Sequence, residues 1–187
     1  MTARRELYIV RHGESVWNVE RRLTGWSDVA LTQRGLAQAS ALRPLLERRT
    51  FTRVWASPLQ RAYQTGVLAW GTPHEVDDRL REFHFGDHEG VPVTALTPDV
   101  IARFRQFDSF SAPGGESGAG FHARVDAFFD TLAPGAHLVF THGGVVRRAL
   151  ERAGRAKFVD NAGVTVIDWD AGEVLDEWPN PLARPAR

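Results

Sequence analysis

The sequence contains no cysteine. Disulfide bonds, a thiolate nucleophile, cysteine-ligated zinc and iron–sulfur clusters are therefore excluded. An excess of charge of either sign is also missing, because 23 Lys and Arg residues balance 23 Asp and Glu residues. Proteins that bind nucleic acid usually carry a basic excess, so a nucleic-acid partner is disfavoured.

Long apolar runs are missing too. No stretch approaches the ~20 residues that cross a bilayer, and the start of the chain, Met1–Glu6, is too charged and its apolar run too short for a signal peptide. We therefore expect a cytoplasmic protein without a membrane partner. At 187 residues, 43% hydrophobic and 25% charged, the chain is expected to form one domain over residues 1–187, with a frayed tail over 179–187.

Short apolar runs alternate with amphipathic segments along the chain. Runs typical of strands lie at 7–10, 53–56, 75–77, 137–141, 164–169 and 173–178. Segments typical of helices lie at 32–49, after 57–58, at 98–107, 121–132 and 144–153. Thr32 and Ser57 are the expected caps of the first two. This alternation predicts an α/β fold, with a mostly parallel sheet covered on both faces.

Two strands end in histidine. The run at 7–10 is followed directly by Arg11, His12 and a glycine that lets the chain turn sharply. A second His-Gly pair begins at His142, after another apolar run. The carboxyl edge of an open α/β sheet is where ligands bind. We predict that these two strand ends meet and hold a phosphate.

Two further segments offer matching chemistry. Arg61 lies in the helix expected after Ser57, where amino-terminal N–H groups favour anions. Glu82 lies in a charged, aromatic and glycine-containing stretch over 80–92 that is typical of a functional loop. Arginines grip a phosphate dianion, a neutral histidine can attack phosphorus, and a carboxylate can protonate the leaving oxygen and then activate water. This set suits phosphoryl transfer without a metal.

The order of these motifs resembles the histidine phosphatase superfamily, also called phosphoglycerate mutase-like, over nearly the whole chain. The matching segments are 11–14 with Asn18, 24–28, 31–35, 57–65, 80–86, 113–117 and 141–144. The resemblance implies a three-layer α/β/α sandwich around a mixed, mostly parallel six-stranded sheet with one antiparallel strand.

The same resemblance implies roles for individual residues. His12 would be the phosphorylated nucleophile, and Glu82 the general acid and then base, in preference to the nearby Asp87 and Glu89. The phosphate pocket would be lined by Arg11, Arg61 and His142, and further substrate contacts would come from Asn18, Arg22, Thr24, Gly25 and Gly143. No metal and no cofactor is implied. The partner would be a small phosphorylated metabolite, whose identity the sequence does not give, and a homodimer stays open.

The resemblance is imperfect at His88, where the family frequently has tryptophan. This difference affects the expected shape or polarity of the pocket wall and leaves the expected chemistry unchanged. The short chain lacks room for the insertions of the mutase branch, which favours a phosphomonoesterase. A cofactor-dependent phosphoglycerate mutase is the first alternative, and a non-catalytic module that binds a phospho-ligand or a protein is the second. A dinucleotide oxidoreductase is disfavoured, because no Gly-x-Gly-x-x-Gly motif follows the first strand.

Overall fold

The computed structural model describes residues 4–72, 75–105 and 110–183. Within these ranges a six-stranded sheet forms the middle layer, in the order β3-β2-β4-β1-β5-β6. Its strands are β1 (Arg5–Arg11), β2 (Arg53–Ala56), β3 (Glu75–Val76), β4 (Gly135–Thr141), β5 (Val164–Asp168) and β6 (Glu173–Trp178). Each of the six sequence-predicted strands is present: β2 and β6 have the predicted bounds, and the bounds of the other four differ by one or two residues.

Strand direction follows the expectation of a mixed sheet. β1, β2, β3 and β4 are mutually parallel, whereas β5 is antiparallel to both of its neighbours, β1 and β6. β5 is therefore the one reversed strand of this sheet. β1 lies between β4 and β5, and its residues 7–10 are buried. A strand buried on both faces needs a continuous apolar run, which is what these four residues supply.

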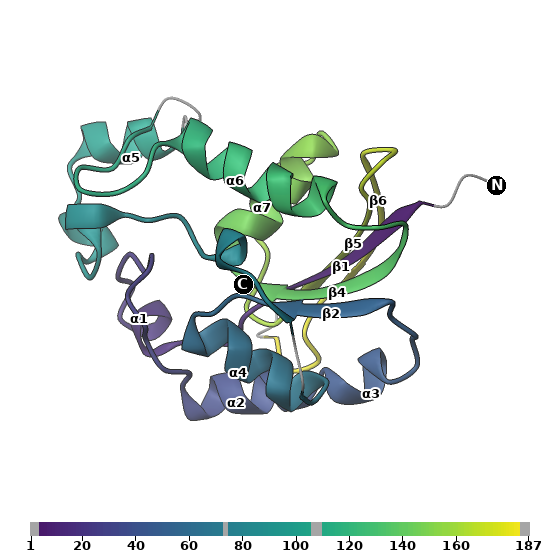
Figure 1. The fold of residues 1–187 in the computed structure, drawn as a ribbon. Helices are drawn as coiled ribbons and strands as arrows, with labels where there is room; N and C mark the ends of the chain where they lie inside the picture. The colour runs from purple at the N-terminus through teal and green to yellow at the C-terminus, as the bar shows by residue number, and fades with distance from the viewer. Residues whose placement is uncertain (1–3, 73–74, 106–109, 184–187) are drawn as a thin grey trace.

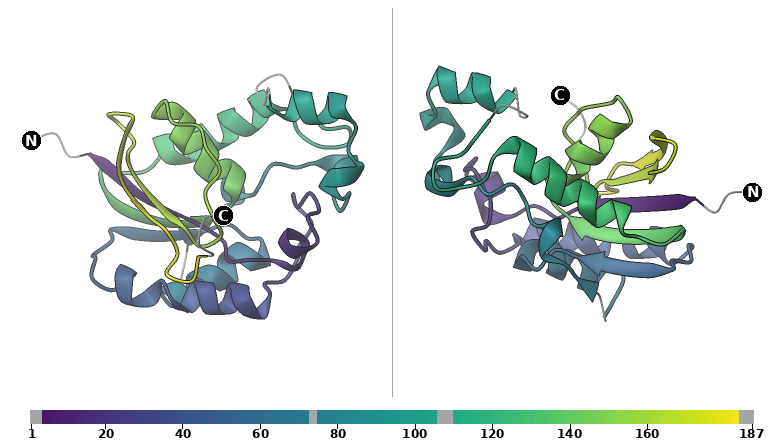
Figure 2. Two further views of the ribbon diagram at one scale, coloured as in Figure 1. Left: turned by 180° about the vertical axis from the view of Figure 1, so that it is seen from behind. Right: turned by 45° about the horizontal axis from the view of Figure 1, so that its top comes forward.

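Helices cover both faces of the sheet (Figure 1). The helices are α1 (Val16–Val19), α2 (Gln33–Ser40), α3 (Arg43–Leu46), α4 (Gln60–Ala69), α5 (Pro98–Arg105), α6 (Gly118–Asp130) and α7 (Gly143–Arg152), with short 3-10 turns η1 (Asp78–Leu80), η2 (Gly86–His88) and η3 (Val93–Ala95). α2, α3 and α4 lie on one face, and α6 and α7 lie on the other (Figures 1 and 2). One apolar core fills each interface, which confirms the three-layer sandwich.

The first long helix differs from its prediction by a break. The helix expected over 32–49 is split into α2 and α3. Thr32 caps α2 as expected, because its hydroxyl accepts from the Gly35 N–H at 3.0 Å. The break follows from Pro44, which occupies the first turn of α3 and cannot donate to the carbonyl of Ser40.

Ser57 does not cap the next helix. α4 begins after Leu59, and the N–H of Gln60 donates to Asp28 Oδ1 at 2.7 Å. A carboxylate from a distant loop therefore serves this helix end, and the Ser57 hydroxyl instead contacts the ring of His142, at 2.8 Å.

The expected frayed tail is anchored at its start. Asn180 is only 2% exposed, and its side-chain amide donates to the carbonyls of Gln38 and Ala162 at 2.9 and 3.2 Å. Residues 184–187 lie outside the described ranges, as do residues 106–107 of the helix expected over 98–107. In the described part of the chain, no helix has both the length and the apolar character needed to cross a bilayer.

Candidate active site

The two histidines that follow β1 and β4 meet at the carboxyl edge of the sheet. Arg11 pairs with Thr141 across the parallel strands, so the next residues, His12 and His142, are neighbours. The backbone N–H of His12 donates to the carbonyl of Thr141 at 2.9 Å, and the two imidazole centroids are 5.3 Å apart. The meeting of the two strand ends is therefore confirmed.

Three buried nitrogen atoms without partners belong to this histidine pair and to the two arginines whose charges act on it. Nε of Arg11, Nε of Arg61 and Nδ1 of His142 have no hydrogen-bond partner among the described residues. The side chains of Arg61 and His142 are fully buried, and His12 is 3% exposed. A buried donor without a partner costs roughly 1–3 kcal/mol, so such groups are rarely grouped together without a function. Two guanidinium groups and an imidazole gathered at one place form a site for an anion.

The fully buried Arg61 is held by a loop between α1 and α2. Its guanidinium donates to the carbonyls of Ser27 and Gly25 at 3.0 and 2.7 Å. Glu89 fixes that loop, because its carboxylate accepts from the N–H groups of Trp26 and Ser27, both at 2.7 Å. Gly25 is required there, since a Cβ at this position would lie 2.2 Å from Glu89 Oε1. Glu89 is thus a positioning residue for the arginine.

The carboxylate of Glu82 lies at the amino terminus of α7. The N–H of Gly144 donates to both of its oxygens at 3.1 Å, and the N–H of Phe83 donates to one of them at 2.9 Å. The partial positive charge of a helix amino terminus favours a carboxylate in this place. Glu82 is therefore fixed against the helix that follows His142, and it lines the same cavity as Arg11 and His12.

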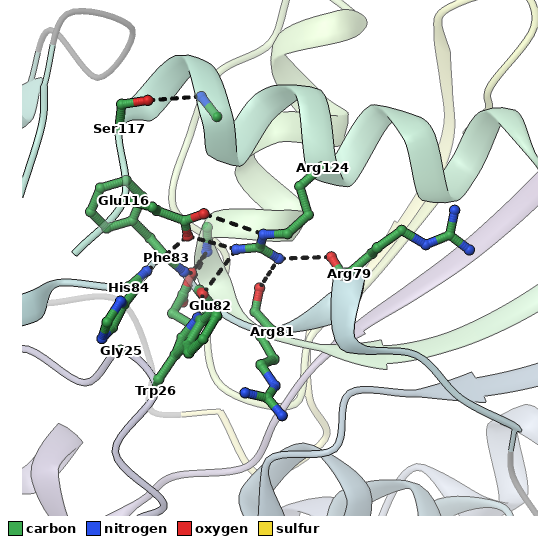
Figure 3. Close-up of polar contacts among 12 residues, drawn as sticks. Gly25, Trp26, Arg79, Arg81, Glu82, Phe83, His84, Glu116, Ser117 and Arg124 are labelled. Atoms are coloured by element: carbon green, nitrogen blue, oxygen red, sulfur yellow. Dashed lines mark hydrogen bonds and ion pairs between the residues drawn. The ribbon is translucent and has the colours of Figure 1, made fainter.

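Arg124 of α6 holds the loop that carries Glu82 (Figure 3). Its guanidinium donates to the carbonyls of Arg79, Arg81 and Glu82, at 2.8, 2.9 and 3.2 Å. It also pairs with Glu116, at 2.6 Å, and both side chains are 18% exposed. One cation therefore fixes three carbonyl groups of the acid loop.

A cavity of about 370 Å³ opens from the histidine pair. Seven of the predicted site residues line it: Arg11, His12, Asn18, Arg22, Thr24, Glu82 and Gly143. The other three, Gly25, Arg61 and His142, are not in the lining. Arg61 and His142 are buried beside His12, and Gly25 contributes the carbonyl that holds Arg61. His88 does not line the cavity either.

Burial and positive charge keep His12 neutral. Burial lowers the pKa of His12 well below its usual range, and the charges of Arg61 and Arg11 lower it further. Its Nδ1 lies 2.7 Å from the carbonyl oxygen of Gly13, which can only accept, so Nδ1 carries the proton. The lone pair on Nε2 is then available. Burial also lowers the pKa of His142, and it lowers that of Arg61 to about 10, which leaves Arg61 cationic at neutral pH.

Comparison with known proteins decides the family. A model of the histidine phosphatase superfamily (branch 1) matches residues 7–180. The chain belongs to this superfamily. It is 34% identical, over 149 residues, to a protein named "Probable phosphoglycerate mutase" from Yersinia pestis, covering 74% of this chain and 69% of the relative.

Solved structures of this superfamily superimpose closely. A phosphoglycerate mutase from Thermus thermophilus has a TM-score of 0.86 and 39% identity, covering 92% of this chain and 98% of that one. A "putative alpha-ribazole-5'-P phosphatase" from Escherichia coli has a TM-score of 0.81 and 26% identity, covering 98% and 100%. The predicted family and fold are both confirmed.

Sequence reasoning missed Arg124 and Asn161, and it considered Glu89 only as an alternative acid, whereas all three residues position other groups of the candidate site. The side-chain amide of Asn161 donates to the His12 carbonyl at 3.2 Å and to Asn18 Oδ1 at 3.1 Å. Their signals in the sequence are weak, because their partners are mostly backbone groups, which every residue carries. Among the residues described, no cluster of three His, Asp or Glu side chains is arranged to hold a metal ion.

Proposed function

We propose that this histidine phosphatase is a metal-independent phosphomonoesterase that hydrolyses a small phosphorylated metabolite through a phosphohistidine on His12. One observation carries the proposal: a neutral histidine with an available Nε2 lies near Arg11, Arg61 and His142, each of which has a buried side-chain nitrogen without a partner. A phosphoryl dianion would satisfy all three at once. Such an arrangement stabilises the charge on the equatorial oxygens during transfer.

The proposed reaction has two steps. In the first, Nε2 of His12 forms a bond to phosphorus, the bond from phosphorus to the ester oxygen breaks, and Glu82 gives a proton to that oxygen. In the second, Glu82 takes a proton from water, the resulting hydroxide attacks phosphorus, and the phosphorus–nitrogen bond breaks. Inorganic phosphate is released and His12 returns to its neutral form. Asn18 hydrogen-bonds to Asn161, and Arg22 and Thr24, which line the cavity, would contact the substrate.

Trapping the intermediate tests the proposal. Rapid quenching after mixing with a ³²P-labelled phosphomonoester should leave an acid-labile, alkali-stable label on His12, and His12→Ala should abolish both label and turnover. His88→Ala, at a histidine outside the cavity, is the matched control and should leave both unchanged. A label on another residue, undiminished turnover in His12→Ala, or loss of activity on adding a chelator would contradict the proposal.

A phosphoglycerate mutase is the second candidate, favoured by the names of two of the relatives. A mutase returns the phosphoryl group to the substrate rather than to water. Incubation with 3-phosphoglycerate, with and without bisphosphoglycerate as primer, separates the two reactions. The phosphatase releases inorganic phosphate without a primer, whereas the mutase forms 2-phosphoglycerate only when primed and releases little phosphate.

A further inference from the structure

The proposed phosphate cradle consists of His12, Arg11, Arg61 and His142. Beyond this cradle, the wall of the cavity is mainly apolar. Eight apolar side chains line it: Leu23, Phe83, Phe85, Val93, Leu96, Ile101, Phe104 and Phe158. They come from the acid loop, η3, α5 and the segments after α1, η3 and α7. α5 and α1 lie at the same end of the molecule, beyond the carboxyl edge of the sheet (Figure 1). A group attached to a phosphoryl held at His12 would therefore lie against hydrocarbon.

The arginines of this wall are already paired. Each of the three that line the cavity beyond the cradle hydrogen-bonds to a carboxylate: Arg22 to Glu20 at 2.7 Å, Arg147 to Glu151 at 2.8 Å, and Arg148 to Asp126 at 2.9 and 2.5 Å. Glu151 itself lines the cavity. The paired carboxylates offset part of the positive charge of these arginines, and Glu151 would repel a second anionic group placed beside it. A carboxylate or a second phosphate held against the eight apolar side chains would also lose its hydration, so the wall disfavours a substrate that carries one.

We propose that the natural substrate is a phosphomonoester of an apolar alcohol or phenol, whose aryl or medium-chain alkyl group fills the wall defined above and carries no second negative charge. This inference rests on the proposed phosphatase function and narrows its substrate class. Phosphoglycerates, which carry a carboxylate and little apolar surface, are then poor substrates. Apolar esters are preferred over phosphoglycerates because their hydrocarbon surface is removed from water in the wall.

A homologous series of esters measures this burial. Ethyl, butyl and hexyl phosphate have leaving alcohols of nearly equal acidity, so differences in kcat/KM report contacts with the wall. We expect kcat/KM to rise by about fourfold per added methylene until the wall is filled, the equivalent of ~0.8 kcal/mol each. Equal kcat/KM along the series, or faster hydrolysis of 3-phosphoglycerate than of hexyl phosphate, would overturn the inference.

Two variants sharpen the test. Ile101→Asn, in the wall, should lower kcat/KM for hexyl phosphate by about tenfold and leave ethyl phosphate nearly unchanged, because only the longer chain contacts the wall. Leu175→Asn, at a 39% exposed leucine of β6 that does not line the cavity, is the matched control and should affect neither ester. An equal loss for both esters in Ile101→Asn would count against the inference.

Binding measurements separate failure of the inference from failure of the proposed function. Alkylphosphonates carry a phosphorus–carbon bond and cannot be hydrolysed, so calorimetry of ethyl- and hexylphosphonate reports the wall without catalysis. Tighter binding of hexylphosphonate by tenfold or more supports the apolar site even if no ester is turned over, in which case the phosphatase proposal fails. Turnover through His12 with equal binding of both phosphonates overturns the apolar site and leaves the phosphatase proposal intact.

Discussion

Replacing Arg124 with methionine should impair proton delivery to the leaving group more than it impairs the fold. Arg124 holds the carbonyls of Arg79, Arg81 and Glu82 and pairs with Glu116. Methionine keeps much of the apolar stem but removes every one of these hydrogen bonds. The acid loop then loses its anchor to α6, and the carboxylate of Glu82 is held only by the N–H groups of Phe83 and Gly144.

The size of each effect follows from the contacts. Breaking a buried ion pair by removing one partner costs about 3–5 kcal/mol, and because both side chains of this pair remain 18% exposed we expect ~2–3 kcal/mol of lost stability. For catalysis, a misplacement by ~1 Å can cost ~10²-fold, and a general acid contributes roughly 10²- to 10⁴-fold. We therefore expect kcat/KM for an alkyl phosphate to fall by ~10²-fold.

Arg5 provides a matched control at the opposite edge of the sheet. Its guanidinium donates to the carbonyls of Phe129 and Asp130 and pairs with Asp170, and its side chain is 19% exposed. Arg5→Met should lower the free energy of unfolding in urea by an amount similar to that in Arg124→Met. Its kcat/KM should stay at the wild-type value under conditions where both variants are folded.

The choice of ester supplies the decisive assay. The 4-nitrophenolate ion leaves without a proton, so Arg124→Met should lower kcat/KM for 4-nitrophenyl phosphate far less than for hexyl phosphate. Equal losses for the two esters would show that Arg124 acts on phosphate binding or folding rather than on the acid. Unchanged kcat/KM for hexyl phosphate would refute the reasoning altogether.

Three further outcomes are expected. The pKa values of His12 and His142 are lowered in the folded state, so below about pH 6.5 the unfolded chain binds protons that the folded chain does not. Urea titrations should therefore show the free energy of unfolding decreasing as the pH is lowered, by up to ~1.4 kcal/mol per pH unit for each histidine. The variant His142→Gln should show a smaller decrease. Glu89→Gln, which loosens the loop that holds the buried arginine of α4, should lower kcat/KM by about tenfold equally for alkyl and nitrophenyl esters. Gly144→Ala would place a methyl group 2.2 Å from Oε1 of Glu82, so kcat/KM for alkyl esters should fall at least tenfold, with circular dichroism unchanged.

The meeting of the catalytic residues was predictable because strand direction does most of the positioning. A parallel sheet brings its carboxyl ends to one edge, so Arg11, His12 and His142 converge once their strands are recognised. Arg61 and Glu82 were candidates from their own segments, Arg61 in the helix after Ser57 and Glu82 in a charged loop, but the choice of Glu82 over Asp87 and Glu89 and the role of each residue came from the family resemblance. In the structure Arg11, His12 and Glu82 line one cavity, and Arg61 and His142 lie buried beside His12.

The sequence did not predict the contacts that hold the site in place, because many of them are made to backbone groups. Arg124 and Asn161 act on backbone carbonyls, and such partners leave no pattern in the sequence. The cap of α4 was mispredicted because Asp28, far away in the chain, competes for the helix end and releases Ser57 to contact His142. The break before α3 could have been predicted from Pro44 alone, because proline is unfavourable in the interior of a helix.

The reversal of β5 decides which connections can influence chemistry. Because β5 begins where β1 ends, the connection that leads into it brings Val159, Asn161 and Ala162 to the backbone and side chains of Arg11 and His12. The hairpin between β5 and β6, residues 169–172, consequently lies at the far end of the sheet. Lengthening that hairpin would extend the molecule away from the candidate site, whereas a one-residue change before β5 would move His12. The length of the loop before β5 is therefore constrained by the position of His12, whereas the hairpin between β5 and β6 can be lengthened without moving that residue.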